Sequence, residues 1–185
     1  MALQGKLSHP NRFITTHNAE GRAIIDESFP TPAPFHLVDS ESDGVAFAEC
    51  YVTSAFPVDT ADGADTLQYR SYLANPPGLA VSGGTVLRYV DMPPGDTSPM
   101  HRTVSLDYGV VLEGEVELVL DSGETKVMRR GDICVQRGTM HAWRNCSQTE
   151  WARMLYVLQP VKPIVVAGQE LKEDYGGIKG VKKSE

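Results

Sequence analysis

The sequence predicts an all-β fold, in which short antiparallel strands close into a barrel or a two-sheet jelly roll. From residue 85 onward, apolar stretches of strand length follow one another at short intervals, and the gaps between them hold the glycine or proline typical of tight turns. In the stretch EVELVLD, apolar residues occupy every second position from Val116, as in a strand with one face toward a core. Helix-period patterns are nearly absent from the middle of the chain, which argues against alternating strands and helices.

The first part of the chain is predicted to form a hairpin and an extended connector. Apolar runs at residues 12–16 and 22–26 flank a polar turn that contains Gly21, a pattern that favours a β-hairpin. Three prolines between residues 30 and 34 then exclude regular structure. We therefore expect an N-terminal β-hairpin extension that precedes the barrel.

The remaining elements are one strand, one loop and a short C-terminal tail. Residues 45–53 read as a strand, and the acidic stretch 57–68 is predicted to be a loop, with a lid over one end of the fold as the alternative. Residues 168–185 are expected to hold one helical turn near QELKEDY and then to fray. All parts belong to one domain: the hairpin, connector and first barrel strands at 1–84, the barrel core at 85–160 and the C-terminal tail at 161–185.

Composition and charge exclude several classes of protein. With 185 residues, of which 41% are hydrophobic, the chain can bury one core without disulfides. The net charge of -7 and the lack of basic clusters beyond Lys182 and Lys183 argue against a nucleic-acid partner. No apolar run of about 18 residues and no signal-like start are present, so we expect no membrane partner and a cytoplasmic location. Three cysteines without CxxC spacing do not suggest a disulfide framework or a zinc ribbon.

Two stretches carry polar residues that could form a site. In GDTSPMHRTVSLDYGVVLEG, His101 and Thr103 share a strand face because side chains alternate, and Asp107 follows shortly after. In GDICVQRGTMHAWRN, His141 begins a strand after a glycine turn. Two histidines and one carboxylate thus come from two neighbouring strand pairs.

These stretches resemble the two motifs of the cupin superfamily. Its first motif runs glycine, five residues, His-x-His, three or four residues, glutamate, six residues and glycine, and Gly95, His101, Thr103, Asp107 and Gly114 stand at those positions. Residues 131–145 resemble the second motif, except that the proline of the motif is replaced in this chain and the Pro-x-Gly segment is one residue shorter. The sequence patterns HRTxSxDYG and QRGTxHAWRN resemble those of a subgroup of small single-domain cupins. The second motif is represented by Gly131, Gly138, His141 and Asn145.

The resemblance implies a cupin-type double-stranded β-helix, a small-molecule substrate and a homodimer in which the N-terminal hairpin is a candidate for strand exchange. It also implies that His101, Asp107 and His141 bind one divalent metal, for which Fe, Mn, Ni and Zn are the candidates. Thr103 stands where a second histidine ligand is expected, and a neutral hydroxyl is a weak ligand beside an imidazole. Two histidines and one carboxylate are still the ligand set of open non-haem iron centres. Two interpretations stay open: a metal site in which Thr103 hydrogen-bonds a ligand or water, or a metal-free cavity whose polar groups bond to one another.

Other residues of the motif strands could act on a substrate. Without a metal, several side chains of the cavity could still donate or accept protons. Burial and nearby charges would shift the pKa of each group and so decide which acts as acid and which as base. Arg88 shares strand alternation with Val86 and Val90, so an inward guanidinium would need an anion, either Asp107 or a substrate carboxylate. Plain packing is the alternative for Tyr108 and Trp143. The candidate catalytic residues are His101, Asp107, Tyr108 and His141, and the candidate substrate-binding residues are Arg88, Met100, Thr103 and Trp143.

Three functions are compatible with these residues. The first hypothesis is an enzyme that acts on a small carboxylated or carbonyl-bearing metabolite through lyase, isomerase or decarboxylase chemistry. An iron-dependent dioxygenase and a non-catalytic ligand-binding module are the alternatives. Burial of two histidines and one carboxyl group in an apolar barrel costs free energy. Such groups are common in active sites, and this favours an enzyme.

Overall fold

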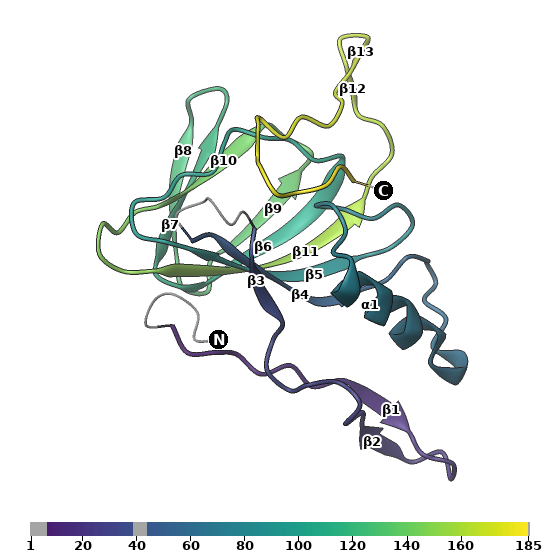
Figure 1. Ribbon diagram of the computed structural model, residues 1–185. Coiled ribbons are helices and arrows are strands. Elements are labelled where there is room, and N and C mark those ends of the chain that lie inside the picture. The colour runs from purple at the N-terminus through teal and green to yellow at the C-terminus, as the bar shows by residue number, and fades with distance from the viewer. Residues whose placement is uncertain (1–6, 39–43, 185) are drawn as a thin grey trace.

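Two antiparallel sheets enclose the core of the computed structural model, which describes residues 7–38 and 44–184 (Figure 1). A six-stranded sheet has the order β3-β4-β5-β11-β6-β9, and a three-stranded sheet has the order β10-β7-β8. This architecture confirms the predicted all-β cupin-type jelly roll. The elements are β1 (Thr15–His17), β2 (Ala23–Ile25), β3 (Phe35–Leu37), β4 (Ala46–Val52), the 3-10 turn η1 (Ala61–Gly63), α1 (Ala64–Ala74), β5 (Val86–Met92), β6 (Ser105–Glu113), β7 (Glu115–Leu120), β8 (Thr125–Arg129), β9 (Ile133–Arg137), β10 (His141–Asn145), β11 (Ala152–Pro160), β12 (Val165–Val166) and β13 (Gln169–Glu170).

The core between the two sheets is built from alternate residues of their strands. β11 pairs with β5 on one side and with β6 on the other, so its inward side chains lie at the centre of the larger sheet. Met154 of β11 and Val111 of β6 are fully buried there, and Trp143 of β10 packs against them from the opposite sheet. Val116 of β7, which the alternation of EVELVLD places on the inward face, is fully buried in the same cluster.

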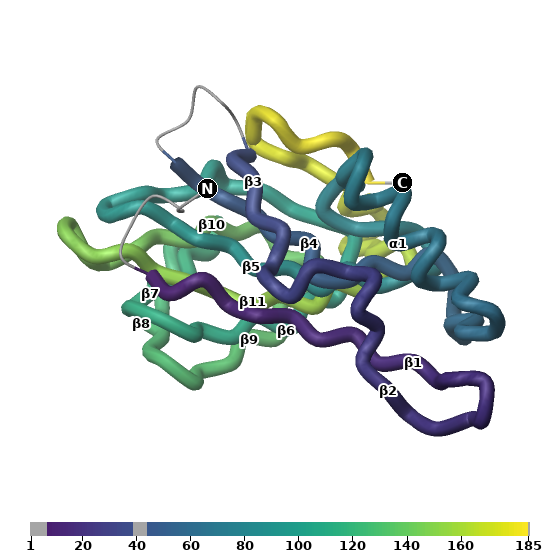
Figure 2. The backbone as a smooth tube through the Cα atoms, turned by 60° about the horizontal axis from the view of Figure 1, so that its bottom comes forward, coloured from purple at the N-terminus to yellow at the C-terminus, as the bar shows by residue number. Residues whose placement is uncertain are grey.

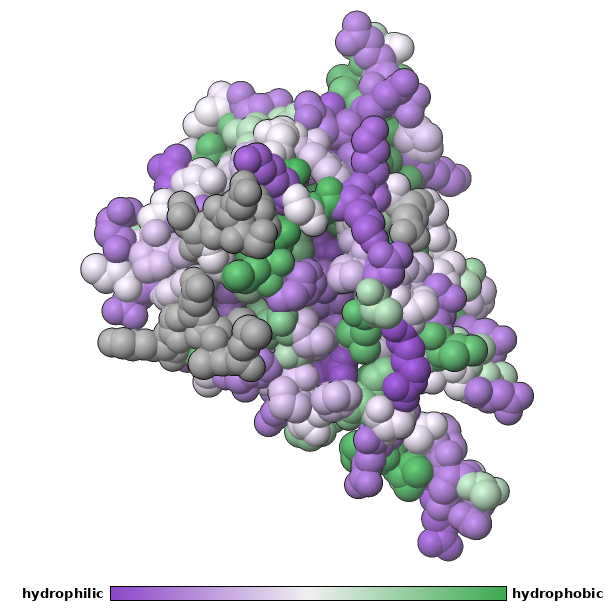
Figure 3. Space-filling view, in the orientation of Figure 1, coloured by the Kyte–Doolittle hydropathy of each residue, from purple (hydrophilic) through white to green (hydrophobic). Residues whose placement is uncertain are grey.

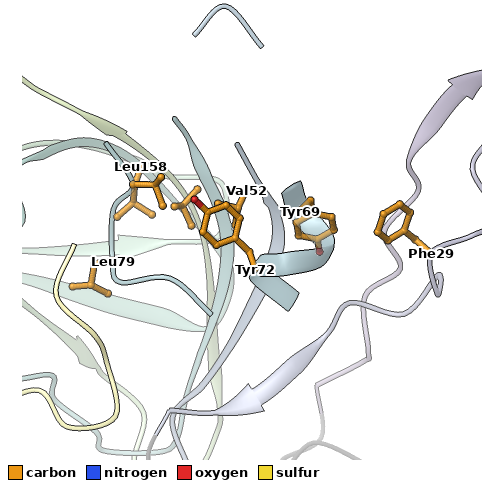
Figure 4. Close-up of a cluster of buried hydrophobic side chains, with 8 residues drawn as sticks. Phe29, Val52, Tyr69, Tyr72, Leu79 and Leu158 are labelled. Atoms are coloured by element: carbon orange, nitrogen blue, oxygen red, sulfur yellow. The ribbon is translucent and has the colours of Figure 1, made fainter. Parts of the chain in front are cut away.

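The prediction of a loop over residues 57–68 is wrong from residue 61 onward, where η1 and α1 form. Their sequence lacks a helical apolar period, and the helix is stabilised by two tyrosines that pack on the barrel (Figure 4). Tyr69 is fully buried and its hydroxyl donates a hydrogen bond to the Glu49 carbonyl at 2.6 Å, while Tyr72 lies in the same cluster. Tertiary contacts thus override a weak local preference. In residues 7–38 and 44–184 no helix has the length and apolar character that a bilayer crossing needs.

The predicted N-terminal hairpin is present as β1 and β2, which pair antiparallel. Its turn is held by the Asn18 side chain, which accepts hydrogen bonds from the backbone N–H groups of Glu20 and Arg22. Gly21 has a φ of 72°, in the left-handed region that favours glycine. The hairpin projects away from the barrel in two views (Figures 1 and 2).

The predicted helical turn near QELKEDY is wrong, because β13 occupies its start and pairs with β12. Ala167 and Gly168 join the two strands, and both have positive φ, at 50° and 79°. A two-residue turn with this geometry matches the twist of a hairpin. The residues that follow do not fray: Tyr175 and Ile178 pack against the cluster that contains the α1 tyrosines.

Candidate active site

A cavity of about 350 Å³ lies between the sheets, a volume typical of small-ligand pockets. More of its lining is apolar than polar, and Trp143, Tyr156 and Phe47 supply aromatic surface. The polar lining comes from both motif stretches, from β5 and from the C-terminal segment. It consists of Arg88, Asp96, Thr97, Ser98, His101, Thr103, Asp107, His141 and Lys179.

Two histidines, here termed the histidine pair, are neighbours across an antiparallel bridge. The backbone N–H of His101 donates to the His141 carbonyl at 2.8 Å, and the reverse bond measures 2.9 Å. Directly opposed residues have side chains on the same sheet face, which places the ring centroids 4.3 Å apart. The pairing of the two motif stretches thus brings together histidines that are 40 positions apart in the sequence.

The protonation of the histidine pair follows from its hydrogen bonds and its burial. Nδ1 of His101 lies 2.8 Å from the Pro99 carbonyl, and Nδ1 of His141 lies 2.9 Å from the Thr139 carbonyl. A carbonyl only accepts, so each Nδ1 carries the proton and each Nε2 carries a lone pair. Burial lowers the pKa of His101, and burial together with the charge of His101 lowers the pKa of His141 to about 4. At neutral pH the pair therefore offers two hydrogen-bond acceptors on the cavity wall.

Asp107 of β6 is the buried carboxyl group of the cavity. It is 4% exposed, and its Oδ1 has no hydrogen-bond partner among the residues that the structure describes. Burial raises the pKa of Asp107 to about 6, although hydrogen bonding from Ser105, the charge of Arg88 and hydrogen bonding from Thr103 act in the opposite direction. The hydroxyl oxygens of Ser105 and Thr103 lie 2.6 Å apart and are hydrogen-bonded to each other. Asp107 is thus near its titration midpoint at about pH 6 and carries an unused acceptor.

Arg88 of β5 lines the cavity, but its anionic partner is not the one that the sequence suggested. Its Nε lies 3.1 Å from Glu49 Oε1, and its Nη2 donates to the Gly78 carbonyl at 2.9 Å. Glu49 is the cross-strand neighbour of Arg88 on β4 and is buried with it. Glu49 is thus the hydrogen-bonded anion of Arg88, whereas Asp107, which the sequence suggested, acts on Arg88 through its charge alone. Arg88, Glu49 and Asp107 are termed the charged cluster below.

Glu49 was missed in the sequence, although a signal was present. It is the one acidic residue in the otherwise apolar strand VAFAECYV, where a charge is expected to be paired or functional. The C-terminal segment was missed as well, and Ile178 and Lys179 from it line the cavity. The residue pattern of this segment gives no indication that it packs against the barrel.

The structure places the remaining predicted residues on two different sides of their strands. Thr103 and Trp143 are buried and line the cavity together with the histidine pair, as predicted. Tyr108 is 40% exposed and faces outward, because it neighbours the inward-facing Asp107 and adjacent side chains alternate. Met100 likewise precedes His101 and is absent from the cavity lining. The predicted catalytic role of Tyr108 and the predicted substrate contact of Met100 are therefore corrected.

The three predicted metal ligands share the cavity without forming a metal centre. Over residues 7–38 and 44–184, no three side chains of His, Cys, Asp or Glu come close enough together to hold an ion. The histidine pair has the fixed tautomer that is common in metal-binding histidines. Asp107 instead lies with the hydroxyls of Ser105 and Thr103 and near Arg88. The donor set as placed does not fit a resident three-ligand metal, and we derive no chemical step through one.

Comparisons with known proteins give one family model and several relatives that match this chain. A model of the cupin domain matches residues 88–158, which include both motif stretches. The phomopsin biosynthesis cluster protein C' of Diaporthe leptostromiformis is 47% identical over 95% of this chain and 89% of its own length. The cupin-domain-containing oxidoreductase srdB of Neurospora crassa is 38% identical over 92% of this chain and 83% of its own. A putative ethanolamine utilization protein Q of Salmonella typhimurium has a TM-score of 0.44 at 17% identity, over 84% of this chain and 99% of that one.

Proposed function

Because the chain belongs to the cupin superfamily, and its relatives bear the names of biosynthesis cluster proteins and oxidoreductases, we propose that it is an enzyme of small-molecule biosynthesis that transfers a proton in the barrel cavity. Lyase, isomerase and decarboxylase reactions of a carbonyl-bearing substrate are the class that this chemistry serves. The observation that carries the proposal is the unpartnered, buried Oδ1 of Asp107 in a cavity of substrate size. A buried acceptor without a partner is costly, and a bound substrate would satisfy it.

Asp107 is the acid–base group of the proposed reaction. Its carboxylate removes a proton from a substrate carbon next to a carbonyl, and the electron pair of the C–H bond moves into the enolate. The carboxylic acid then returns the proton to another carbon in an isomerisation, or to a leaving hydroxyl group that departs as water in an elimination. A pKa of about 6 populates both forms of Asp107 near neutral pH, as such a group requires.

The residues around Asp107 position the substrate. The two Nε2 lone pairs of the histidine pair accept hydrogen bonds, so the substrate should present hydroxyl groups to them. Arg88 supplies positive charge near the developing enolate, since its charge already acts on Asp107. Trp143 and Tyr156 enclose the apolar part of the substrate and exclude water.

Solvent exchange tests this function without knowledge of the natural substrate. A panel of ketones, β-keto acids and hydroxy ketones with apolar side chains is incubated with the protein in D₂O, and NMR measures deuterium at the carbon next to the carbonyl. Asp107→Asn should slow exchange on any active member by about a hundredfold or more, because it removes the proton acceptor. Asp121→Asn, an exposed aspartate outside the cavity, is the matched control and should exchange like the wild type. Unchanged exchange by Asp107→Asn, or no exchange by the wild type on any member, would count against the proposal.

Oxidoreductase chemistry is the second candidate, and the names of the relatives favour it. It would consume an oxidant such as dioxygen, whereas proton transfer needs no co-reactant. Metal analysis of protein purified without chelator addresses this candidate, and His141→Ala would lose any metal that the histidine pair holds. About one equivalent of Fe, Mn, Ni or Zn, together with oxygen uptake in the presence of substrate, would favour it. Metal below a tenth of an equivalent after supplementation would count against it.

A further inference from the structure

A tyrosine in the middle of the larger sheet lines the cavity, and its hydroxyl group has a weak hydrogen-bond partner. We propose that this residue, Tyr156, is a second catalytic residue: its hydroxyl donates a hydrogen bond to the carbonyl oxygen of a ketone or aldehyde substrate and to the enolate oxygen formed from it. The inference rests on the proposed proton transfer by Asp107, and it adds the group that binds the substrate oxygen.

The register of the sheet places Tyr156 beside the charged cluster. Its cross-strand neighbours are Arg88 of β5 and Gly109 of β6, and Asp107 precedes Gly109 by two positions on the same inward face. Tyr156 lines the cavity together with Arg88 and Asp107. A substrate in this cavity can therefore contact the phenol and the carboxyl group at the same time.

The Tyr156 hydroxyl is bound to a weak acceptor. It donates to Met154 Sδ at 3.0 Å, and a thioether sulfur accepts hydrogen bonds less well than a carbonyl oxygen. Burial, and after it the charge of Asp107, raises the pKa of Tyr156 well above its ordinary value, so the hydroxyl keeps its proton at neutral pH. Exchange of the sulfur for a substrate oxygen would give this buried donor a better partner.

Gly109 allows the Tyr156 ring to lie directly against β6. A Cβ atom at position 109 would stand 3.0 Å from Tyr156 Cε1, so a side chain there would displace the ring. Glycine weakens a strand interior, and it often marks such a close approach. Trp143 of the opposite sheet packs edge-on against the ring, with centroids 5.8 Å apart. The ring is thus held between two sheets, and this fixes the position of its hydroxyl.

Several polar groups around Asp107 are already engaged. The Thr103 and Ser105 hydroxyls are bonded to each other and form hydrogen bonds with Asp107. Two nitrogens of Arg88 donate to a carboxylate and to a backbone carbonyl. The histidine pair accepts hydrogen bonds at neutral pH. An enolate oxygen needs a donor, and Tyr156 supplies one beside the group that removes the proton.

In the proposed step the substrate lies between Asp107 and Tyr156. The Asp107 carboxylate takes the proton from the carbon next to the carbonyl, the C–H electron pair forms the C=C bond, and a C=O electron pair moves to the oxygen. Tyr156 keeps its proton, and its hydrogen bond strengthens as the oxygen becomes negative. The cavity lining is more apolar than polar, unlike the largely hydrophilic surface in Figure 3, and this setting strengthens the bond further. The step needs no oxidant and no further reactant.

Exchange kinetics test the hydroxyl group directly. On a ketone that the wild type exchanges in D₂O, Tyr156→Phe should lower kcat by about a hundredfold with little change in KM, because the hydrogen bond strengthens in the transition state. Tyr108→Phe removes a hydroxyl from the outer face of β6, and this matched control should exchange like the wild type. Equal rates for Tyr156→Phe and the wild type would overturn the proposal.

Binding of a phenolate tests the donor without turnover, which separates this inference from the proposed function. The probe is para-nitrophenol, whose coloured anion carries negative charge on oxygen as an enolate does. Asp107→Asn protein, neutral at position 107, should bind the anion, and addition of Tyr156→Phe should weaken binding by about a hundredfold. Addition of Tyr108→Phe is the control and should leave binding unchanged.

The two measurements give distinct outcomes. No binding of the anion by Asp107→Asn protein, or equal binding by the two double variants, would overturn the role of Tyr156 even where exchange depends on Asp107. Binding that depends on Tyr156, in a protein that exchanges no ketone, would support Tyr156 as the group that binds the oxygen and would count against proton transfer by Asp107.

Discussion

The histidine pair and Asp107 line one cavity, yet burial shifts their pKa values in opposite directions. It lowers the pKa of His101 and His141, and it raises the pKa of Asp107. In both cases burial disfavours the charged form, so the histidines stay neutral and the carboxyl group holds its proton to higher pH. Burial also lowers the pKa of Arg88, and the charge and hydrogen bond of Glu49 act in the opposite direction. Burial therefore favours the neutral form of each of these groups, and a partner of opposite charge opposes that effect.

The largest effect on stability is expected when the ion pair between Glu49 and Arg88 is broken. Glu49→Gln leaves the Arg88 guanidinium buried without its anion, and we expect a loss of about 3 to 5 kcal/mol in the free energy of unfolding. Urea denaturation measures it. Glu115→Gln, which breaks an exposed pair with Arg129, is the control and should cost below about 1 kcal/mol. Equal losses in the two variants would mean that burial does not distinguish these ion pairs.

The next effect is a loss of stability in acid that originates in the histidine pair. The pKa of His141 is about 4 in the folded protein and 6.5 in an exposed histidine, so the unfolded chain binds the proton first as the pH falls. The stability that neutral His141 contributes is therefore lost between about pH 6.5 and 4, with a total of about 3 kcal/mol. His141→Gln should flatten that part of the curve of unfolding free energy against pH. A variant with the same slope as the wild type would contradict a buried neutral imidazole.

Asp107 should show a smaller effect of opposite sign. Its pKa is raised from 3.8 to about 6, so the folded protein binds the proton more tightly than the unfolded chain between these values. Stability from this group is full below about pH 4 and is lost as the pH rises through 6. Asp107→Asn should then be more stable than the wild type by about 2 to 3 kcal/mol at pH 8 and nearly equal to it at pH 4. Thermal unfolding at the two pH values measures this, and a destabilised variant at pH 8 would show that the carboxylate has a favourable partner.

The sequence predicts the interior of the barrel better than its surroundings. The spacing of His101, Thr103 and Asp107 predicts a shared inward face because strand alternation is a local rule, and the same rule could have excluded Tyr108 and Met100. The partner of Arg88 could not be inferred, since it depends on the register between β4 and β5, which are separated by α1. The helix itself forms through the contacts of Tyr69 with the barrel, and such contacts leave no periodic pattern in the sequence.

The C-terminal segment has a consequence for the proton affinity of Asp107. Residues 174–184 return to the barrel, where Asp174 and Arg102 exchange two backbone hydrogen bonds, and the segment supplies Ile178 and Lys179 to the cavity wall. A side chain at Gly176 would overlap the Met100 carbonyl, so the path of this segment depends on that glycine. Displacement of the segment would admit water to the cavity and let the carboxyl group ionise at lower pH. The last residues of the chain thus form part of the wall of the cavity in which the pKa of Asp107 is raised, and a variant that loses this wall is expected to have a lower pKa at Asp107.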